Sequence, residues 1–246
     1  MVSRKSVLSV ATAVATLSYV VAAPSANAAV WLPTGTDAWE TPANWGAPFV
    51  TQPPGASDDA DIQNGGTAVI TTNVGRVLRL RVGTTGSSTT NQVILNTGAN
   101  IIVGNIAGST MSAFIGDGPG RFGTLTINGG TFATSGTGGV ASNFQIGRNG
   151  GHGLIDVNGG TLNTAAVLAV INGTFDVSAG DVNIGTNLTA RRGNVVISGG
   201  DVTVGNTILN GFQTDGNASL TIVGVARPTS ARPTTSRPSM PEEQPN

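Results

Sequence analysis

The chain has 246 residues, which is enough for one large all-β domain or two small ones. Glycine accounts for 36 residues, while 10% of residues are charged and 4% are aromatic, so a thick aromatic core is excluded and a thin core of Val, Ile, Leu and Ala is favoured. The absence of cysteine excludes disulfides and thiolate metal sites, and a formal net charge of −1 offers no basic surface for nucleic acid.

Residues 1–28 have the features of a secretory signal peptide. Arg4 and Lys5 form a positive start, residues 7–23 are a run of small and apolar residues, and residues 26–28 (Ala-Asn-Ala) fit the small-x-small cleavage rule. A membrane anchor is the alternative, but Ser and Thr interrupt the run. No other stretch approaches the roughly 20 apolar residues of a membrane helix. We therefore expect a secreted or cell-surface protein with no transmembrane span in the mature chain.

Residues 29–55 differ from the rest of the chain. They hold all three tryptophans, Trp31, Trp39 and Trp45, together with five prolines. Exposed indole rings can stack on sugars, which makes these three residues candidates for ligand binding. The alternative is a cap, because the first turn of a repeat structure exposes apolar core that needs covering. We favour an N-terminal Trp-rich cap, and the two roles are compatible if one ring remains exposed.

A short pattern of alternating apolar residues closed by glycines recurs through the second half of the chain. The apolar pairs of successive copies begin at Leu125, Ile155, Phe175, Val195 and Leu220. A period of about 20–30 residues, with short period-2 strands and Gly/Asn corners, is typical of one coil of a parallel β-solenoid. An antiparallel sandwich gives no reason for such a period.

We therefore predict an all-β fold in which residues 56–224 form one parallel β-solenoid (β-helix) whose coils have roughly 20–30 residues each. Stacked coils would bury one continuous column of apolar side chains, because a single coil is too thin to bury its own face. Phe175, Val177, Val195 and Ile197 should point inward, with Val177 stacked on Ile197.

Two stretches upstream, residues 61–73 and 93–104, carry the same alternation in a less regular form, and we interpret them as earlier coils. Between them, residues 76–82 alternate apolar residues with Arg79 and Arg81, which predicts a strand with an arginine-bearing outer face. This face could be a phosphate or sulfate site, but we favour a solvated strand face.

The last segment, residues 225–246, is rich in Pro, Arg, Thr and Ser and has no apolar periodicity. We expect a disordered tail outside the fold, because the segment has too little apolar surface to offset the entropy of ordering. It could be a stalk or linker, or the product of a truncated or frameshifted reading frame.

Two parts of the sequence resemble large secreted bacterial proteins. The opening WLPTGTDAWETPANWGAPFVTQPPGASDDADIQNGGTAVIT resembles a tryptophan-bearing segment that leads into a PGxxDxAxIxNGGTAxVT-like strand. LTINGGTF and VVISGGDVTVG resemble autotransporter-associated β-strand repeats and those of PEP-CTERM-sorted surface proteins. The resemblance covers about residues 31–224. It implies secretion, a β-solenoid and a surface or matrix role, and it brings no catalytic residues.

Few residues offer catalytic or metal chemistry. His152 is the only histidine, so a Ser-His-Asp triad would have to use it and a three-histidine zinc site is impossible. The loop around it, GGHGLIDV, resembles a calcium-binding nonapeptide, but Ile155 displaces Asp156 by one position and so onto the wrong face. We interpret His152 as a loop residue without a catalytic role.

Carboxylates recur at the coil period. Asp156 and Asp176 are one period apart, as are Asp181 and Asp201, so stacked coils would place each pair about 5 Å apart. Such pairs could share a calcium ion or act as acid and base. Exposure and turn-forming preference explain them without either role, and we favour that explanation.

The sequence thus predicts a non-enzymatic, secreted or cell-surface structural or adhesive protein without metal or cofactor. Its expected partners are extracellular polysaccharide or other surface and matrix proteins, and nucleic acid is not expected. The alternatives are an extracellular carbohydrate-binding module, which exposed aromatic residues would mark, and a β-helix polysaccharide-degrading enzyme, which charged groups clustered over a groove would mark.

Overall fold

The computed structural model describes residues 28–84, 90–104, 111–135, 143–210, 217–223 and 229–230. Over these residues the chain is all-β, and all its named strands pair in parallel. The expected signal peptide lies outside the described residues except for Ala28, and so does the expected tail except for Thr229 and Ser230.

The first of two sheets runs the length of the described chain. Among the described residues it has eight strands, which lie side by side in chain order. They are β1 (Ala28–Val30), β3 (Asp59–Ile62), β6 (Arg79–Val82), β9 (Met111–Asp117), β12 (Asn143–Arg148), β14 (Leu168–Val170), β16 (Asn187–Ala190) and β19 (Thr207–Asn210).

The second sheet has two limbs, which β13 and β15 join because each of them passes from one limb into the other. The first limb contains β2 (Thr36–Ala38), β4 (Thr67–Ile70), β7 (Thr90–Leu95), β10 (Phe122–Ile127), β13 (His152–Thr164), β15 (Gly173–Ile184), β17 (Asn194–Ile197) and β20 (Ser219–Ile222). The second limb contains β5 (Asn73–Val77), β8 (Asn100–Val103), β11 (Thr131–Thr134), β13, β15, β18 (Asp201–Val204) and β21 (Thr229–Ser230). A short 3-10 helix, Pro42–Asn44, precedes β3.

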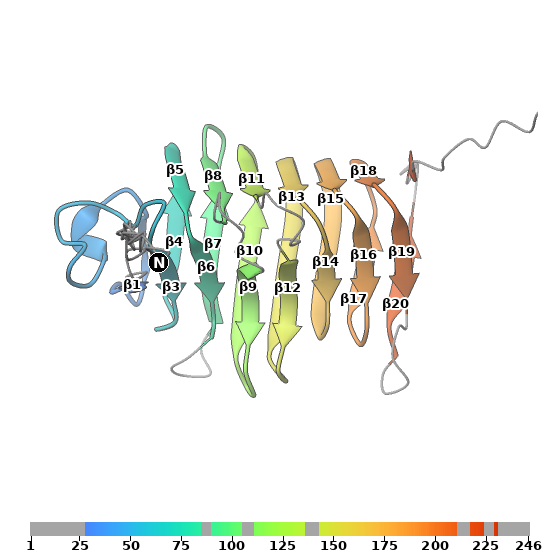
Figure 1. Ribbon diagram of the computed structural model, residues 1–246, viewed down its shortest axis with the longest axis horizontal. Helices are drawn as coiled ribbons and strands as arrows, with labels where there is room; N and C mark the ends of the chain where they lie inside the picture. Colours follow the sequence, from blue (N-terminus) through green and yellow to red (C-terminus); the bar gives the residue numbers. More distant parts are fainter. Residues whose placement is uncertain are drawn as a thin grey trace, which may run out of the picture.

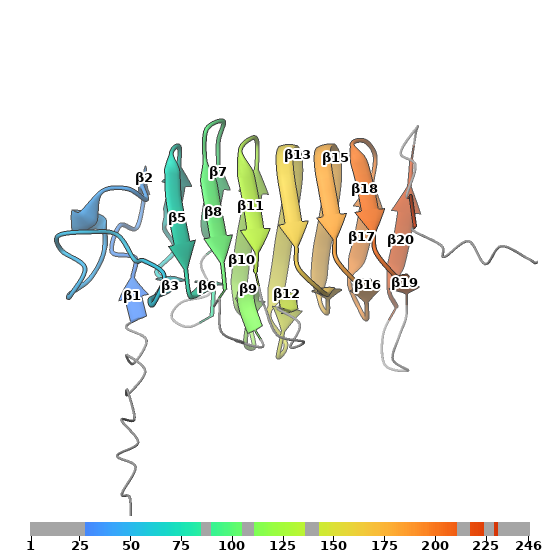
Figure 2. The ribbon, with the colours of Figure 1, turned by 45° about the horizontal axis from the view of Figure 1, so that its top comes forward.

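The strands follow one another in layers. From β3 onward, each strand of the first sheet is followed by a first-limb segment and then a second-limb segment, which β13 and β15 each supply as one continuous strand, before the chain enters the next layer. Among the described strands, the first layer has only β1 and β2. Figures 1 and 2 show the layers succeeding one another in sequence order along the long axis of the molecule. Phe175 pairs with Val195 and Val177 with Ile197 on parallel strands, so the predicted register is confirmed and an antiparallel sandwich is excluded for these strands.

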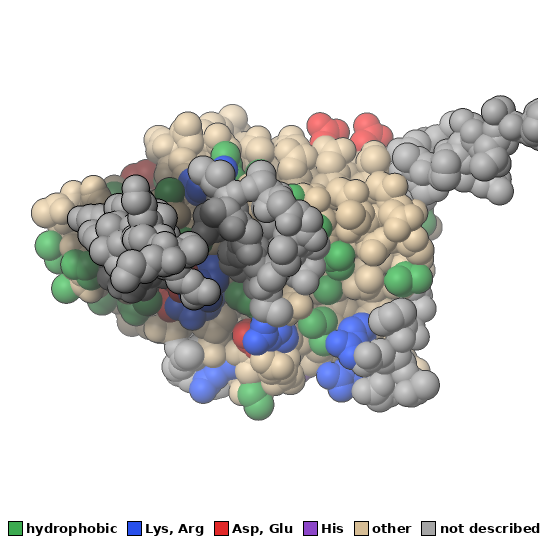
Figure 3. Space-filling view, in the orientation of Figure 1, with side chains coloured by type: hydrophobic (Ala, Val, Ile, Leu, Met, Phe, Trp, Pro, Cys, Tyr) green, Lys and Arg blue, Asp and Glu red, His purple; other side chains and the backbone are tan. Residues whose placement is uncertain are grey.

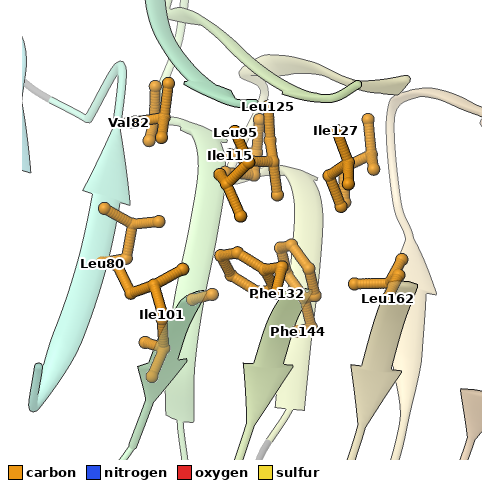
Figure 4. Close-up of a cluster of buried hydrophobic side chains, with 14 of the residues drawn as sticks. Leu80, Val82, Leu95, Ile101, Ile115, Leu125, Ile127, Phe132, Phe144 and Leu162 are labelled. Atoms are coloured by element: carbon orange, nitrogen blue, oxygen red, sulfur yellow. The ribbon is translucent and has the colours of Figure 1, made fainter. Parts of the chain in front are cut away.

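The core is the narrow space between the first sheet and the two limbs. Its side chains come from alternate strand positions, as period-2 strands require, and each of them stacks on its counterpart in the next layer. Figure 4 shows Leu80, Val82, Leu95, Ile101, Ile115, Leu125, Ile127, Phe132, Phe144 and Leu162. The rings of Phe132 and Phe144 stack with centroids 5.3 Å apart. Burying each such side chain stabilises the fold by about 1.5–3 kcal/mol before entropy is subtracted.

The tryptophan-bearing segment lies at the N-terminal end of this core, where Figures 1 and 2 show it beside β3 and β4. The backbone N–H of Trp31 donates to the backbone carbonyl of Asp61 (2.9 Å), and the backbone N–H of Trp39 donates to that of Val69 (2.8 Å). The segment therefore extends both sheets by a partial layer. Trp45 packs edge-on against both other indoles, with ring centroids 5.1 Å from Trp31 and 4.6 Å from Trp39. The three rings therefore close this end of the core.

Candidate ligand-binding surface

The three tryptophans predicted as candidate ligand-binding residues form a buried cluster. The exposed fraction of Trp31, Trp39 and Trp45 is 0%, and the indole N–H of Trp45 donates to the carbonyl of Trp39 (2.9 Å). No indole face is open to a sugar ring. The idea of an exposed stacking platform is therefore corrected: burying large apolar rings against the first full layer leaves them no free face.

The predicted carboxylate pairs do lie in register. Asp156 pairs with Asp176 and Asp181 with Asp201 on adjacent parallel strands, in the first and second limbs respectively. One carboxylate oxygen of Asp156 accepts a hydrogen bond from the side-chain amide of Asn158 (2.9 Å). Within the described parts of the chain, no group of three or more His, Asp or Glu side chains is placed to hold a metal ion. The pairs give each limb two adjacent negative charges.

The arginine-bearing outer face of β6 is an ion-pair ladder with β3. Arg79 Nε lies 2.8 Å from Asp59 Oδ1, and Arg81 binds Asp61 through Nε (2.5 Å) and a second nitrogen (2.8 Å). Both aspartates are buried. Burial raises the pKa of the Asp61 carboxyl, and the hydrogen bonds and charge of Arg81 oppose that rise. These arginines neutralise buried carboxylates, so we do not regard them as a binding site for phosphate or sulfate.

A hollow of about 380 Å³ lies between Glu40, residues 52–55 and the start of β5. One oxygen of the Glu40 carboxylate accepts hydrogen bonds from the backbone N–H groups of Thr71 (2.9 Å) and Thr72 (3.0 Å) and from the Thr72 hydroxyl (3.0 Å). Burial alone would raise the pKa of Glu40, but these hydrogen bonds lower it overall. Glu40 thus fastens the tryptophan segment to the turn between β4 and β5.

A different set of side chains lines the corner at which the first sheet passes into the first limb. Phe122 and His152 are paired in register, and their rings stack with centroids 5.3 Å apart and planes 12° apart. Asn172 follows one layer later; its amide nitrogen donates to the carbonyl of Gly151 (2.8 Å) and lies 3.4 Å from His152 Nε2. Arg192, in the layer after that, donates its backbone N–H to the carbonyl of Ile171 (3.1 Å). We call Phe122, His152, Asn172 and Arg192 the corner ladder.

Closely packed glycines allow the tight backbone contacts at this corner. Each residue of the corner ladder comes directly before a glycine, and those glycines are Gly123, Gly153, Gly173 and Gly193. At the end of β9, Gly116 has φ +71° and packs so closely that a Cβ there would lie 1.9 Å from the carbonyl oxygen of His152. Only glycine accepts both this backbone conformation and this contact without strain. Gly123 is packed just as closely, because a Cβ there would lie 2.2 Å from the carbonyl oxygen of Val82. Gly123 therefore faces the interior, and the preceding Phe122 points outward.

Three further arginines lie close to the corner ladder along the chain: Arg121 and Arg191 directly precede Phe122 and Arg192, and Arg148 ends β12, four residues before His152. The guanidinium of Arg148 lies 4.9 Å from the centre of the Phe114 ring, and its Nε is 3.4 Å from Asp117. Figure 3 shows several basic side chains along the lower edge of the face in view, where the strands of the first sheet end. We call the corner ladder and these three arginines together the corner surface.

The corner surface could not be recognised from the sequence, because the ladder residues share neither size nor charge. The signal that marks them is the column of glycines that directly follows them and recurs with the repeat. His152, interpreted from the sequence as a loop residue without a catalytic role, stands in this row.

No match to the chain was found among family models, curated proteins or solved structures. No helix in the described ranges has the length and the hydropathy needed to cross a membrane.

Proposed function

We propose that this protein is a parallel β-solenoid that serves as a non-enzymatic structural or adhesive protein, secreted or held at the cell surface. Each layer is one coil, and each coil presents one first-sheet strand and two limb strands. The observation that carries the proposal is the parallel register from layer to layer, in which Ile155, Phe175, Val195 and Leu220 pair in turn. Such a register builds a rod with side chains repeated along its length.

A rod of this kind suits adhesion and scaffolding better than catalysis. Repeated surface columns can hold an extended partner through many weak contacts, whose joint effect exceeds that of any single contact. A catalytic site needs different groups brought to one point, whereas the acidic pairs here lie on separate limbs and the histidine ring stacks on Phe122.

The location can be tested apart from the activity. The full chain, expressed with residues 1–28 in a bacterial host, is expected outside the cytoplasm, and its N-terminus is expected at Ala29 by sequencing of the processed protein. Retention of the uncleaved chain in the cytoplasm would contradict secretion.

The activity is tested by incubating the purified chain with soluble extracellular polysaccharides. We expect retention of the chain on immobilised envelope or matrix polysaccharide, without release of reducing ends or unsaturated products. Product that accumulates in proportion to the protein concentration, and that disappears after Asp156→Asn/Asp176→Asn or Asp181→Asn/Asp201→Asn, would contradict the non-enzymatic proposal and support a β-helix polysaccharide-degrading enzyme.

A second candidate function is that of an extracellular carbohydrate-binding module. The observation in its favour is the corner ladder, because Phe122 keeps 41% of its surface exposed although it is large and apolar. Exposed large apolar side chains beside polar ones are common at sites of contact with a partner.

A further inference from the structure

Charge at the corner surface is unbalanced. Arg148 is paired with Asp117, but no carboxylate within the described residues lies at ion-pair distance from Arg121, Arg191 or Arg192. By contrast, Arg79 and Arg81 on β6 bind aspartates of the neighbouring strand. The corner surface thus holds guanidinium groups that no carboxylate in the described part of the chain neutralises, and Arg192 is exposed.

The aromatic part of the corner surface also favours negatively charged ligands. Phe122 and His152 each cover one face of the other, so the pair presents mainly ring edges to a ligand. The edge of an aromatic ring is the positive part of its quadrupole. Both the ring edges and the guanidinium groups therefore attract negatively charged oxygens.

The groups are arranged along a line. Phe122, His152, Asn172 and Arg192 occupy the same corner of successive layers, and adjacent strands of a sheet lie about 4.8 Å apart. A ligand that meets all of them must be extended and must run along the long axis of the molecule. A single small anion would contact only one or two layers.

We propose that the corner surface binds an acidic polysaccharide, one bearing carboxylate or sulfate groups, with the sugar chain lying along the corner ladder. Arg121, Arg191 and Arg192 pair with its anionic groups, the amide of Asn172 hydrogen-bonds to its hydroxyls, and the ring edges of Phe122 and His152 face its negatively charged oxygens. The inference rests on the proposed function and deepens it by naming the ligand class. Binding is measured on the purified chain, so it can fail while the solenoid scaffold stands.

Single-stranded nucleic acid is the competing polyanion. Its sequence-tolerant binding needs open aromatic faces on which bases stack. At the corner surface one face of each ring is taken by the other ring, and all three tryptophans are buried. These observations favour the polysaccharide.

The first test measures binding of the full chain to alginate (carboxylated), dextran sulfate (sulfated), neutral dextran and single-stranded DNA at one fixed low salt concentration. We expect binding to one or both acidic polysaccharides that weakens as salt is added, and none to neutral dextran. The acidic polymer that binds more tightly identifies the anionic group. No binding to either acidic polysaccharide, or tighter binding to DNA, would overturn the proposal.

Variants locate the site. Arg191→Gln/Arg192→Gln should weaken polysaccharide binding by about five- to tenfold, as expected for the loss of two exposed ion pairs. Arg227→Gln/Arg232→Gln removes the same charge outside the corner surface and should change binding less than about twofold. Equal losses in the two variants would show that net charge alone drives binding and would overturn the assignment to the corner.

A further measurement needs no variant. His152 is the only histidine and is exposed, so its modification by diethyl pyrocarbonate, followed by mass spectrometry on untagged protein, reports on the corner ladder alone. We expect saturating acidic polysaccharide to slow this modification several-fold, while neutral dextran leaves the rate unchanged. An unchanged rate with acidic polysaccharide bound would place the ligand elsewhere and contradict the proposal.

Discussion

Val177 on β15 lies directly opposite Ile197 on the parallel strand β17, and both side chains are fully buried. On its other side Val177 pairs with Val157 of β13. One side chain is thus held between its counterparts in the preceding and the following layer. This relationship makes the stability of each layer depend on the identity of its neighbours.

Val177→Asp should therefore be strongly destabilising. The new carboxylate would be buried between two valine or isoleucine side chains without a counter-ion, which costs about 3–5 kcal/mol in the free energy of unfolding. The matched control is Thr174→Asp, because Thr174 is half-buried on the outward side of β15, lies opposite uncharged residues on both neighbouring strands, and should tolerate the charge with a loss of about 1 kcal/mol or less. Urea unfolding measures both; similar losses would mean that Val177 does not face the core.

Trp45→Ala tests the closed N-terminal end. Removing the ring that packs against both Trp31 and Trp39 leaves a cavity, with an expected loss of about 3–5 kcal/mol and increased aggregation by light scattering. Leu32→Ala is the control, since Leu32 is in the same segment but 53% exposed, and its loss should be under about 1 kcal/mol. Unchanged stability and solubility of Trp45→Ala would argue against a capping role.

The alternation of apolar residues was enough to predict the parallel register at Val177 and Ile197, because a buried face fixes which residues must stack. The tryptophan-rich composition of residues 29–55 favoured a cap, but it left open whether one ring stays exposed, because the burial of Trp31 depends on how the chain folds over the first full layer. Alternation also fails at Thr134, a polar residue that points inward. Its buried hydroxyl accepts a hydrogen bond from the N–H of Ala165 (3.0 Å), so the next layer provides its partner. The corner ladder escaped prediction because its unlike side chains share only a place before a glycine.

Arg81→Met should destabilise the protein in a pH-dependent way. It leaves Asp61 buried without its guanidinium partner, and breaking a buried pair from one side costs about 3–5 kcal/mol at neutral pH. Burial already raises the pKa of Asp61, and losing Arg81 raises it further. A raised pKa favours the folded state once the carboxyl is protonated, so the variant should recover stability as the pH falls.

Unfolding at about pH 8 and about pH 5 measures this recovery. The control Arg81→Met/Asp61→Asn removes the titrating carboxyl and should recover less between the same two values. If the single and double variants depend on pH alike, Asp61 is not the group responsible.

Glu40→Gln should loosen the attachment of the tryptophan segment. The lowered pKa of Glu40 means that its carboxylate contributes stability above the ordinary value of 4.5, and that this contribution is lost as the pH falls through the lower folded value. The variant should lose about 1 kcal/mol at neutral pH, a small amount because the group is partly exposed. The difference from the wild type should shrink below pH 4.5. A difference that stays constant with pH in paired unfolding curves would rule out the Glu40 carboxylate as its source.

Disulfide trapping tests most directly the claim that parallel layers succeed one another in the register of the repeat. The chain has no cysteine, and the exposed residues Asp181 and Asp201 pair on adjacent parallel strands, about 4.8 Å apart, within the reach of a disulfide. Asp181→Cys/Asp201→Cys should form an intramolecular disulfide nearly completely under mild oxidation, as seen by mass spectrometry. Asp181→Cys/Thr203→Cys, two positions out of register on the same face, should form far less. Efficient trapping of the second pair and not the first would contradict the parallel register of successive layers.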